Sequence, residues 1–253
     1  MGPPSMLEGV LYRDRVVVVV ALLSVIALSW LWVALGAGMD MSAVEMTRMP
    51  RDMVMTPAVW TAGYAALMVS MWFVMMVAMM LPSATPMLLI FARVSRRERA
   101  AERPWVPTGI FASGYLAAWA CFSVGAVAMQ WGLEESGLLS AMMVTTTTWL
   151  GAAILITAGL WQTTPIKHAC LRQCRSPVSF LATHWRAGRG GAFWMGLTHG
   201  AYCLGCCWIL MALLFFGGVM NLWLEKTLPI GHWLAYAVGG ALVVWGVGLV
   251  VSG

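Results

Sequence analysis

The segment His199–Trp208, with the sequence HGAYCLGCCW, contains four side chains of the types that bind soft metal ions. Its imidazole and three thiols recur at positions i, i+4, i+7 and i+8, which share one face of a helix. These four candidate ligands are His199, Cys203, Cys206 and Cys207. A single cysteine in an apolar helix more often packs as a small hydrophobic residue. Four such groups on one face instead predict a metal site, because polar side chains inside a membrane span are costly.

A methionine stripe in an earlier apolar segment favours copper as the metal. Its members recur at helical spacing, and they are Met68, Met71, Met75 and Met79, flanked by Met76 and Met80. Thiolates, thioethers and neutral imidazole select Cu(I), whereas zinc shares only the cysteine and histidine ligands. We take Met75, Met76, Met79 and Met80 as candidate ligands and zinc as the competing metal. Plain packing remains the alternative for the stripe, since methionine fills apolar cores well.

Two further groups of soft ligands flank the buried candidates. Residues 38–56 are methionine-rich, with Met39, Met41, Met53 and Met55 as candidate ligands of an entrance, or simply a Met-rich loop. A basic segment contains His168, Cys170 and Cys174, whose two cysteines lie one helical turn apart. We expect the neighbouring Lys167, Arg172 and Arg175 to lower the pKa of both thiols. Together the three groups suggest a route for the ion, with its direction left open.

Composition places these groups in a membrane protein. The chain has 253 residues, of which 61% are hydrophobic and 10% charged, and its mean hydropathy is +0.81. Apolar runs of about 20 residues predict an all-α, polytopic bundle that forms one integral membrane domain over residues 1–253. The six predicted spans are 16–36, 57–92 with a proline break or bend at 82–86, 108–131, 141–161, 192–220 and 228–251. Nucleic-acid binding is excluded because the basic residues lie in short blocks between the spans.

The distribution of lysine and arginine predicts the orientation of the bundle. Connectors on one side carry twelve of these residues and those on the other side carry three. The basic side faces the cytoplasm, so both termini are expected there, in a multi-pass protein of the bacterial inner membrane. The run Val16–Ala37 is too long for a cleaved signal core, so we expect it to remain as the first span.

Three sequence blocks resemble the signatures of a known family. They are WFVMMVAMMLPSATP at 72–86, QTTPIKHACLRQCRSP at 162–177 and HGAYCLGCCWILMALLFFGGVMN at 199–221. The chain is similar through these blocks to a bacterial family of predicted metal-binding integral membrane proteins, a domain of unknown function. The resemblance implies six or seven spans and a metal-related role. The chain is shorter than the family pattern between Asn221 and Glu225, which leaves the span count near 221–230 open.

Three classes of function fit these observations. The first is a protein that handles Cu(I) as a transporter, a metallochaperone or an assembly factor for a cuproprotein partner. The second is a membrane thiol–disulfide oxidoreductase that uses Cys203 and Cys206, although the connectors on the external side contain no partner cysteine. The third is an accessory subunit of a larger complex or oligomer, packed through small residues. Hydrolytic chemistry has no support, since no nucleophile or phosphate-binding motif is present.

Overall fold

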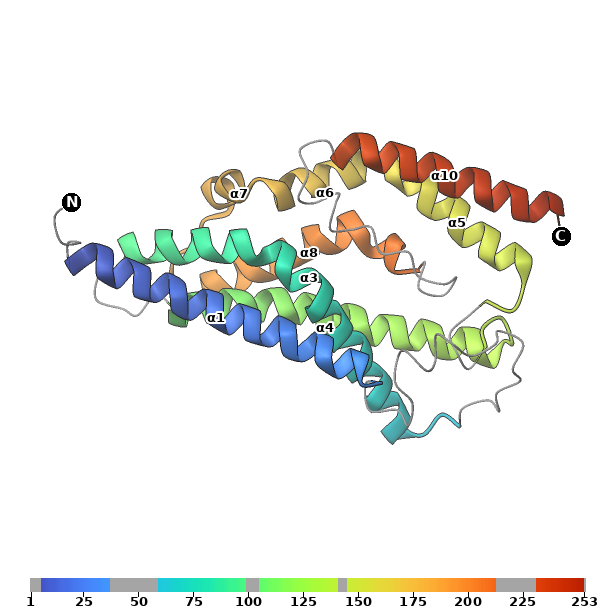
Figure 1. Ribbon diagram of the computed structural model, residues 1–253, viewed down its shortest axis with the longest axis horizontal. Helices are drawn as coiled ribbons and strands as arrows, with labels where there is room; N and C mark the ends of the chain where they lie inside the picture. Colours follow the sequence, from blue (N-terminus) through green and yellow to red (C-terminus); the bar gives the residue numbers. More distant parts are fainter. Residues whose placement is uncertain (1–5, 37–58, 99–104, 141–144, 213–230, 253) are drawn as a thin grey trace. The chain divides into compact units, whose positions relative to one another are not determined.

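The computed structural model is all-helical over the residues that it describes, which are 6–36, 59–98, 105–140, 145–212 and 231–252. In chain order its helices are α1 (Met6–Ala34), α3 (Ala62–Glu98), α4 (Trp105–Glu135), α5 (Thr148–Gln162), α6 (Pro165–Arg175), α7 (Pro177–His184), α8 (Gly188–Ala212) and α10 (Gly231–Ser252) (Figure 1). The all-α prediction is confirmed. Helices α6 and α7 occupy the basic segment between the predicted fourth and fifth spans.

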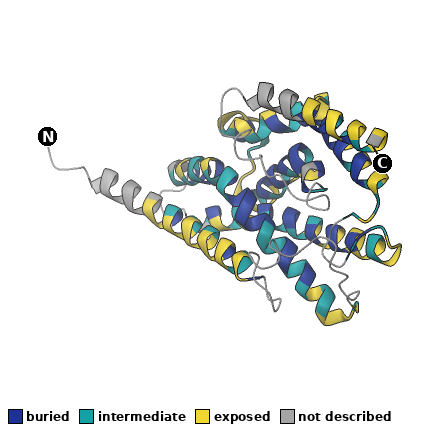
Figure 2. Ribbon diagram, turned by 45° about the vertical axis from the view of Figure 1, so that its right-hand side comes forward, coloured by how far each residue is buried: buried dark blue, intermediate teal, exposed yellow. Residues whose placement is uncertain are grey.

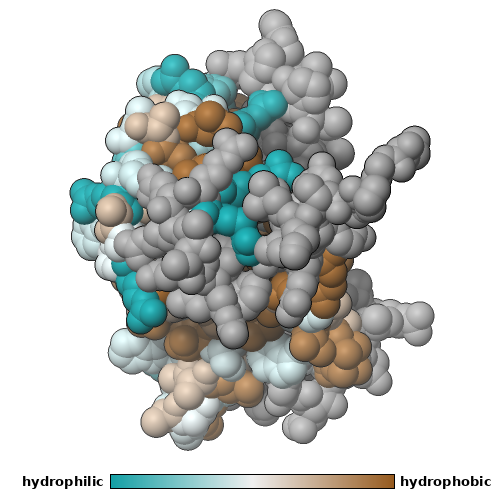
Figure 3. Space-filling model, turned by 90° about the vertical axis from the view of Figure 1, so that its left-hand side faces the viewer, coloured by the Kyte–Doolittle hydropathy of each residue, from teal (hydrophilic) through white to brown (hydrophobic). Residues whose placement is uncertain are grey.

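Three of the described helices are long and apolar enough to cross a membrane, over Val16–Ala34, Ala62–Arg96 and Pro107–Glu135. Two shorter apolar helical segments cover Thr148–Gln162 and Gly239–Val251. Many large apolar residues of these helices are exposed. Exposed residues follow α1 along most of its described length (Figure 2), and hydrophobic residues reach the surface on the face drawn in Figure 3. Exposed apolar surface of this kind is typical of lipid-facing helices.

The described residues fall into two compact units. The first unit takes its residues from 1–47, 73–121 and 176–201, and the second from 48–72, 122–175 and 202–253. Helices α3, α4 and α8 each contribute one part to each unit. We therefore describe the contacts of each unit separately.

In the first unit, α3 continues through Pro82 and Pro86 without interruption. The helix is therefore not broken at these prolines, and the bend that the sequence predicts as the alternative stays a prediction. Hydroxyl groups bond to backbone carbonyls in this stretch: Ser83 Oγ donates to Met80 O at 2.8 Å, and Tyr115 Oη of α4 donates to the same oxygen at 3.2 Å.

Glycines bring α4 and α8 into backbone contact in the first unit. A Cβ atom on Gly196 would lie 1.9 Å from the carbonyl oxygen of Phe111, and one on Gly114 would lie 2.1 Å from that of Phe193. No larger residue fits at either position without moving a helix. Small residues allow this close approach in membrane helix pairs.

In the second unit, a buried polar network joins the start of α3 to the end of α4. Trp72 Nε1 donates to Gln130 Oε1 at 3.0 Å, and Gln130 Nε2 donates to Glu134 Oε1 at 2.9 Å. Trp60 Nε1, just before α3, donates to Glu134 Oε2 at 2.9 Å. Because Gln130 is fully buried, these bonds satisfy groups that would otherwise be costly to remove from water.

The second unit also contains the pair α5 and α10, which pack along each other. Gly159 of α5 lies so close to α10 that an added Cβ would be 2.6 Å from the carbonyl oxygen of Gly239. Trp161 of α5 meets Trp208 of α8 edge to face, with ring centroids 5.5 Å apart. Among the described residues of the predicted span 141–161, those from Thr148 onward are helical, and Thr145 pairs with Leu139 in an isolated β-bridge.

Candidate metal centre

Three thiols come together in the second unit. The Sγ atoms of Cys174, Cys203 and Cys206 all lie within 4.8 Å of one another. Cys203 and Cys206 are buried, Cys174 is partly exposed, and all three are free thiols. Metal–sulfur bonds of about 2.3 Å, the length found in zinc thiolates, would set the sulfurs of a trigonal site about 4 Å apart. The three sulfurs therefore fit a small soft ion with modest movement.

Helix α8 supplies two of the thiols from a single turn. Cys206 follows Cys203 by three residues, and its thiol donates a hydrogen bond to the Cys203 carbonyl oxygen at 3.1 Å. The thiol of Cys207 donates to the same oxygen at 2.9 Å. Cys207 is also buried, but it is not one of the three clustered sulfurs. Two adjacent cysteines of one helix thus have different environments.

Helix α6 supplies the third thiol. Pro165 occupies its first position, where the missing N–H costs no helical bond, and the N–H of Lys167 donates to Thr164 Oγ1 at 3.3 Å. The side chain of Lys167 is fully buried, and its Nζ donates to Gln162 Oε1. Cys174 lies two turns after Lys167 on the same face of α6, and this face is directed toward the interior of the second unit.

The environment of the thiols favours their neutral form. The pKa of Cys174 is raised well above its usual 9.0, chiefly by hydrogen bonding with Cys203 and Cys206 and then by burial. The pKa of Cys170 is also raised, by burial first and by the charge of Cys206 second. The expectation that nearby basic residues lower both pKa values is wrong. Both pKa values are raised by neighbouring thiols and by desolvation, because each of these disfavours a thiolate.

Comparison with known proteins bears on which ion such a cluster would take. Residues 69–249 match the family PpoB2, which is described as a copper chaperone family, and this match covers more than half of the chain. The chain belongs to the PpoB2 copper chaperone family. No match was found among curated proteins or among solved structures.

Membership in the PpoB2 family supports the copper part of the sequence-based prediction. The matched residues include α6, α8 and all three clustered thiols. Sulfur ligands suit copper in its Cu(I) state, and they are also among the ligands of zinc. The family description names copper, so copper association is the better supported of the two.

His199 lies in the first unit, in an aromatic environment. It is 2% exposed, and its ring centroid is 5.1 Å from that of Phe180, 5.9 Å from that of Tyr115 and 6.2 Å from that of Phe111. The three-sulfur cluster belongs to the second unit. A role for His199 as a copper ligand in this PpoB2 family member stays a prediction.

The candidate methionines divide into two groups. Met76, Met79 and Met80 are buried in the first unit, and Met75 is half-buried there. The candidates Met39, Met41, Met53 and Met55 lie outside the described residues. The ligand role of both groups stays a prediction for this member of the PpoB2 family.

The sequence predicts that the basic segment and the His199–Trp208 segment form separate metal-binding sites along one route. The structure instead joins Cys174 of the first segment to Cys203 and Cys206 of the second. His168 and Cys170, the other candidates of the basic segment, are half-buried on α6 and lie outside the three-sulfur cluster. The helical spacing of the cysteines identified the thiols of α6 and those of α8 separately. It did not reveal that Cys174 lies beside Cys203 and Cys206.

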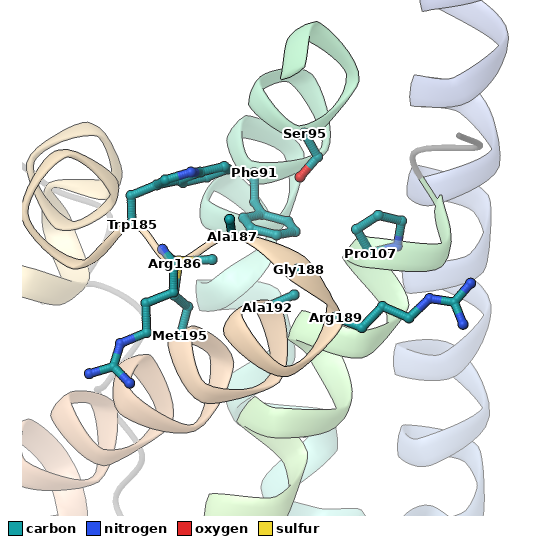
Figure 4. Close-up of a pocket in the computed structure, with 10 residues that line it drawn as sticks. All are labelled: Phe91, Ser95, Pro107, Trp185, Arg186, Ala187, Gly188, Arg189, Ala192 and Met195. Carbon is teal, nitrogen blue, oxygen red and sulfur yellow. The ribbon is translucent and has the colours of Figure 1, made fainter. Parts of the chain in front are cut away.

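The described pocket in the first unit is not a comparable site. It has a volume of about 30 Å³ and lies among α3, α4 and the start of α8, with Phe91, Pro107 and Trp185 in its wall (Figure 4). Figure 4 shows the guanidinium groups of Arg186 and Arg189 pointing away from the Phe91 ring. A space of this size holds about one water molecule, so it does not admit a substrate.

Proposed function

We propose that this chain is an integral-membrane metallochaperone that holds Cu(I) on the thiolates of Cys174, Cys203 and Cys206 and passes it to a cuproprotein. The observation that carries the proposal is the meeting of three free thiols within 4.8 Å in a chain of a copper chaperone family. Thiolate sulfur binds Cu(I) in preference to harder ions. The ion is cargo here, and the chain's own residues hold it and release it.

The net charge of the site also favours a monovalent ion that either two or three thiolates bind. Two thiolates with Cu(I) carry one net negative charge and three carry two, and buried charge is costly. Because bound thiols must lose their protons, loading of the site releases protons.

The membrane arrangement belongs to the same proposal. Six spans with both termini in the cytoplasm of a bacterial inner membrane are supported by three long apolar helices, by the apolar α5 and α10, and by the twelve-to-three bias of basic residues. In this arrangement α6 and α7 belong to a cytoplasmic connector. The site would then draw one thiol from a connector and two from a span.

Copper content of the purified protein tests the proposal. The detergent-solubilised chain, reconstituted anaerobically with Cu(I), should bind about one equivalent through sulfur. Cys203→Ser, Cys206→Ser and Cys174→Ser should each lose most of this copper when a competing chelator is present. Cys121→Ser is the matched control, because Cys121 is an exposed free cysteine of α4 in the first unit.

The neighbouring cysteines of α8 give a sharper comparison. Cys206→Ser removes a clustered sulfur, whereas Cys207→Ser removes a buried sulfur one residue away. We expect copper loss from the first variant and retention in the second. Equal copper content in both, or preferential binding of zinc by the parent chain, would contradict the proposal.

A thiol–disulfide oxidoreductase is the second candidate function, favoured by the short distance between the thiols of Cys203 and Cys206. A mixed disulfide trapped on a Cys203→Ser or Cys206→Ser variant in cells would support this function. A copper transporter is the remaining alternative, and Cu(I) uptake into vesicles that depends on Cys206 would favour it over a chaperone.

A further inference from the structure

A fourth thiol touches the three-sulfur cluster from α6. Cys170 is half-buried and precedes Cys174 by one helical turn, so the two cysteines share a face. Its Sγ lies 2.7 Å from the position that a Cβ on Gly205 would occupy. Gly205 stands between Cys203 and Cys206 in α8. The Cys170 sulfur therefore rests against the backbone that links two of the clustered thiols.

Cys170 is close to the cluster without belonging to it. Its sulfur lies against Gly205, the residue directly before Cys206. It is not among the three sulfurs whose mutual distances are all within 4.8 Å. The lack of a side chain at Gly205 leaves the space into which this fourth thiol fits, since an added Cβ would also lie 3.5 Å from the Cys170 Cβ.

The geometry points to Cys170 as an exchange thiol, and this inference rests on the proposed function. An exchange thiol is here a sulfur that replaces Cys206 on Cu(I) while the ion enters or leaves the site. A chaperone must bind its cargo firmly and still release it quickly. A neighbouring sulfur resolves this conflict, because a new bond forms before the old bond is fully broken. The neighbour acts at a high effective concentration because the fold holds it beside the site.

The exchange step is balanced without any redox change. As the Cys170 sulfur bonds to Cu(I), its thiol loses its proton. The bond between Cu(I) and the Cys206 sulfur breaks, and Cys206 takes up one proton. Copper remains Cu(I) throughout, and the numbers of thiolates, thiols and protons are the same before and after the step.

Release kinetics test this inference directly. The parent chain and a Cys170→Ser variant are loaded anaerobically with Cu(I), and each is mixed with an excess of the water-soluble Cu(I) chelator bathocuproine disulfonate. The colour of the copper–chelator complex reports the rate. We expect equal copper content and release slowed about tenfold in Cys170→Ser, with the parent rate in the Cys121→Ser control.

A second variant displaces the Cys170 thiol without removing any sulfur. Gly205→Ala places a methyl group 2.7 Å from the present position of the Cys170 sulfur, too close for a real contact, so it should displace that sulfur and slow release in a similar way. In a Cys170→Ser background, the alanine should slow release no further, because the displaced thiol is already absent. Gly240→Ala in α10 is the matched control, because no atom lies within 4 Å of the added Cβ.

The outcomes separate the inference from the proposed function. Release from Cys170→Ser at the parent rate would overturn the exchange role, and so would loss of bound copper, which would make Cys170 a permanent ligand. Either result leaves the three-thiol chaperone site in place. A parent chain that takes up no Cu(I) would overturn the proposed function, and the exchange thiol with it.

Discussion

At the scale of single residues, Cys174 shows how neighbours decide the state of a side chain. Three basic residues lie within seven positions before or after it on α6, namely Lys167, Arg172 and Arg175. Nevertheless the thiols of Cys203 and Cys206 and the loss of water raise its pKa. Neighbouring thiols and the loss of water therefore decide the state of this thiol, although basic residues are close to it in the sequence.

The raised pKa predicts how the stability of the metal-free protein depends on pH. An unfolded cysteine loses its proton near 9.0, whereas folded Cys174 keeps its proton to higher pH. The stabilisation is therefore complete below the unfolded value and is lost as pH rises through the folded value. The unfolding temperature of the parent in detergent should fall as the pH rises above about 9, and that of Cys174→Ser should fall less. Parallel curves for the two proteins would contradict the shift.

At the scale of helices, the α4–α8 contact of the first unit depends on missing side chains. Gly196→Ala would bring a methyl group into the carbonyl of Phe111. We expect a loss of about 1–3 kcal/mol, which overpacking typically costs. Gly109→Ala on α4 is the control, because nothing lies within 4 Å of its added Cβ. Thermal unfolding in detergent distinguishes them, and an unchanged midpoint for Gly196→Ala would speak against the contact.

The polar network of the second unit gives a prediction for the pairing of α3 with α4. Gln130→Leu removes the acceptor of the Trp72 N–H and a donor to Glu134. Losing these buried hydrogen bonds should cost about 1–3 kcal/mol. In a double-mutant cycle with Trp72→Phe, the second substitution should cost less once Gln130 is absent. Strictly additive losses in unfolding free energy would mean that the two side chains act independently.

At the scale of the whole molecule, the membrane arrangement predicts which surfaces water-soluble reagents reach. In a background with all native cysteines changed to serine, Ser136→Cys should react with a membrane-impermeant maleimide in intact cells from which any outer membrane has been removed. Ala187→Cys should react only after the inner membrane is opened. Both positions are exposed in the structure, so burial does not explain a difference. The reverse pattern would invert the proposed topology.

The sequence by itself determined what depends on local geometry. Apolar runs predicted helices, and the spacing of Cys203 and Cys206 predicted that both thiols share one helical face, because helix periodicity acts over a few residues. Copper as the metal also followed from residue type, and the family match supports it.

Only the tertiary structure decided that Cys174 completes the cluster and that Gly205 makes room for the Cys170 sulfur. It also decided that the pKa values of two thiols in a basic segment are raised, that of Cys174 chiefly by neighbouring thiols and that of Cys170 chiefly by burial. It also showed that α3 continues through Pro82, where a hydroxyl from another helix bonds the nearby Met80 carbonyl. Each of these features depends on atoms from segments far apart in the chain. Local spacing carries no information about which helix packs against which, so it could not reveal them.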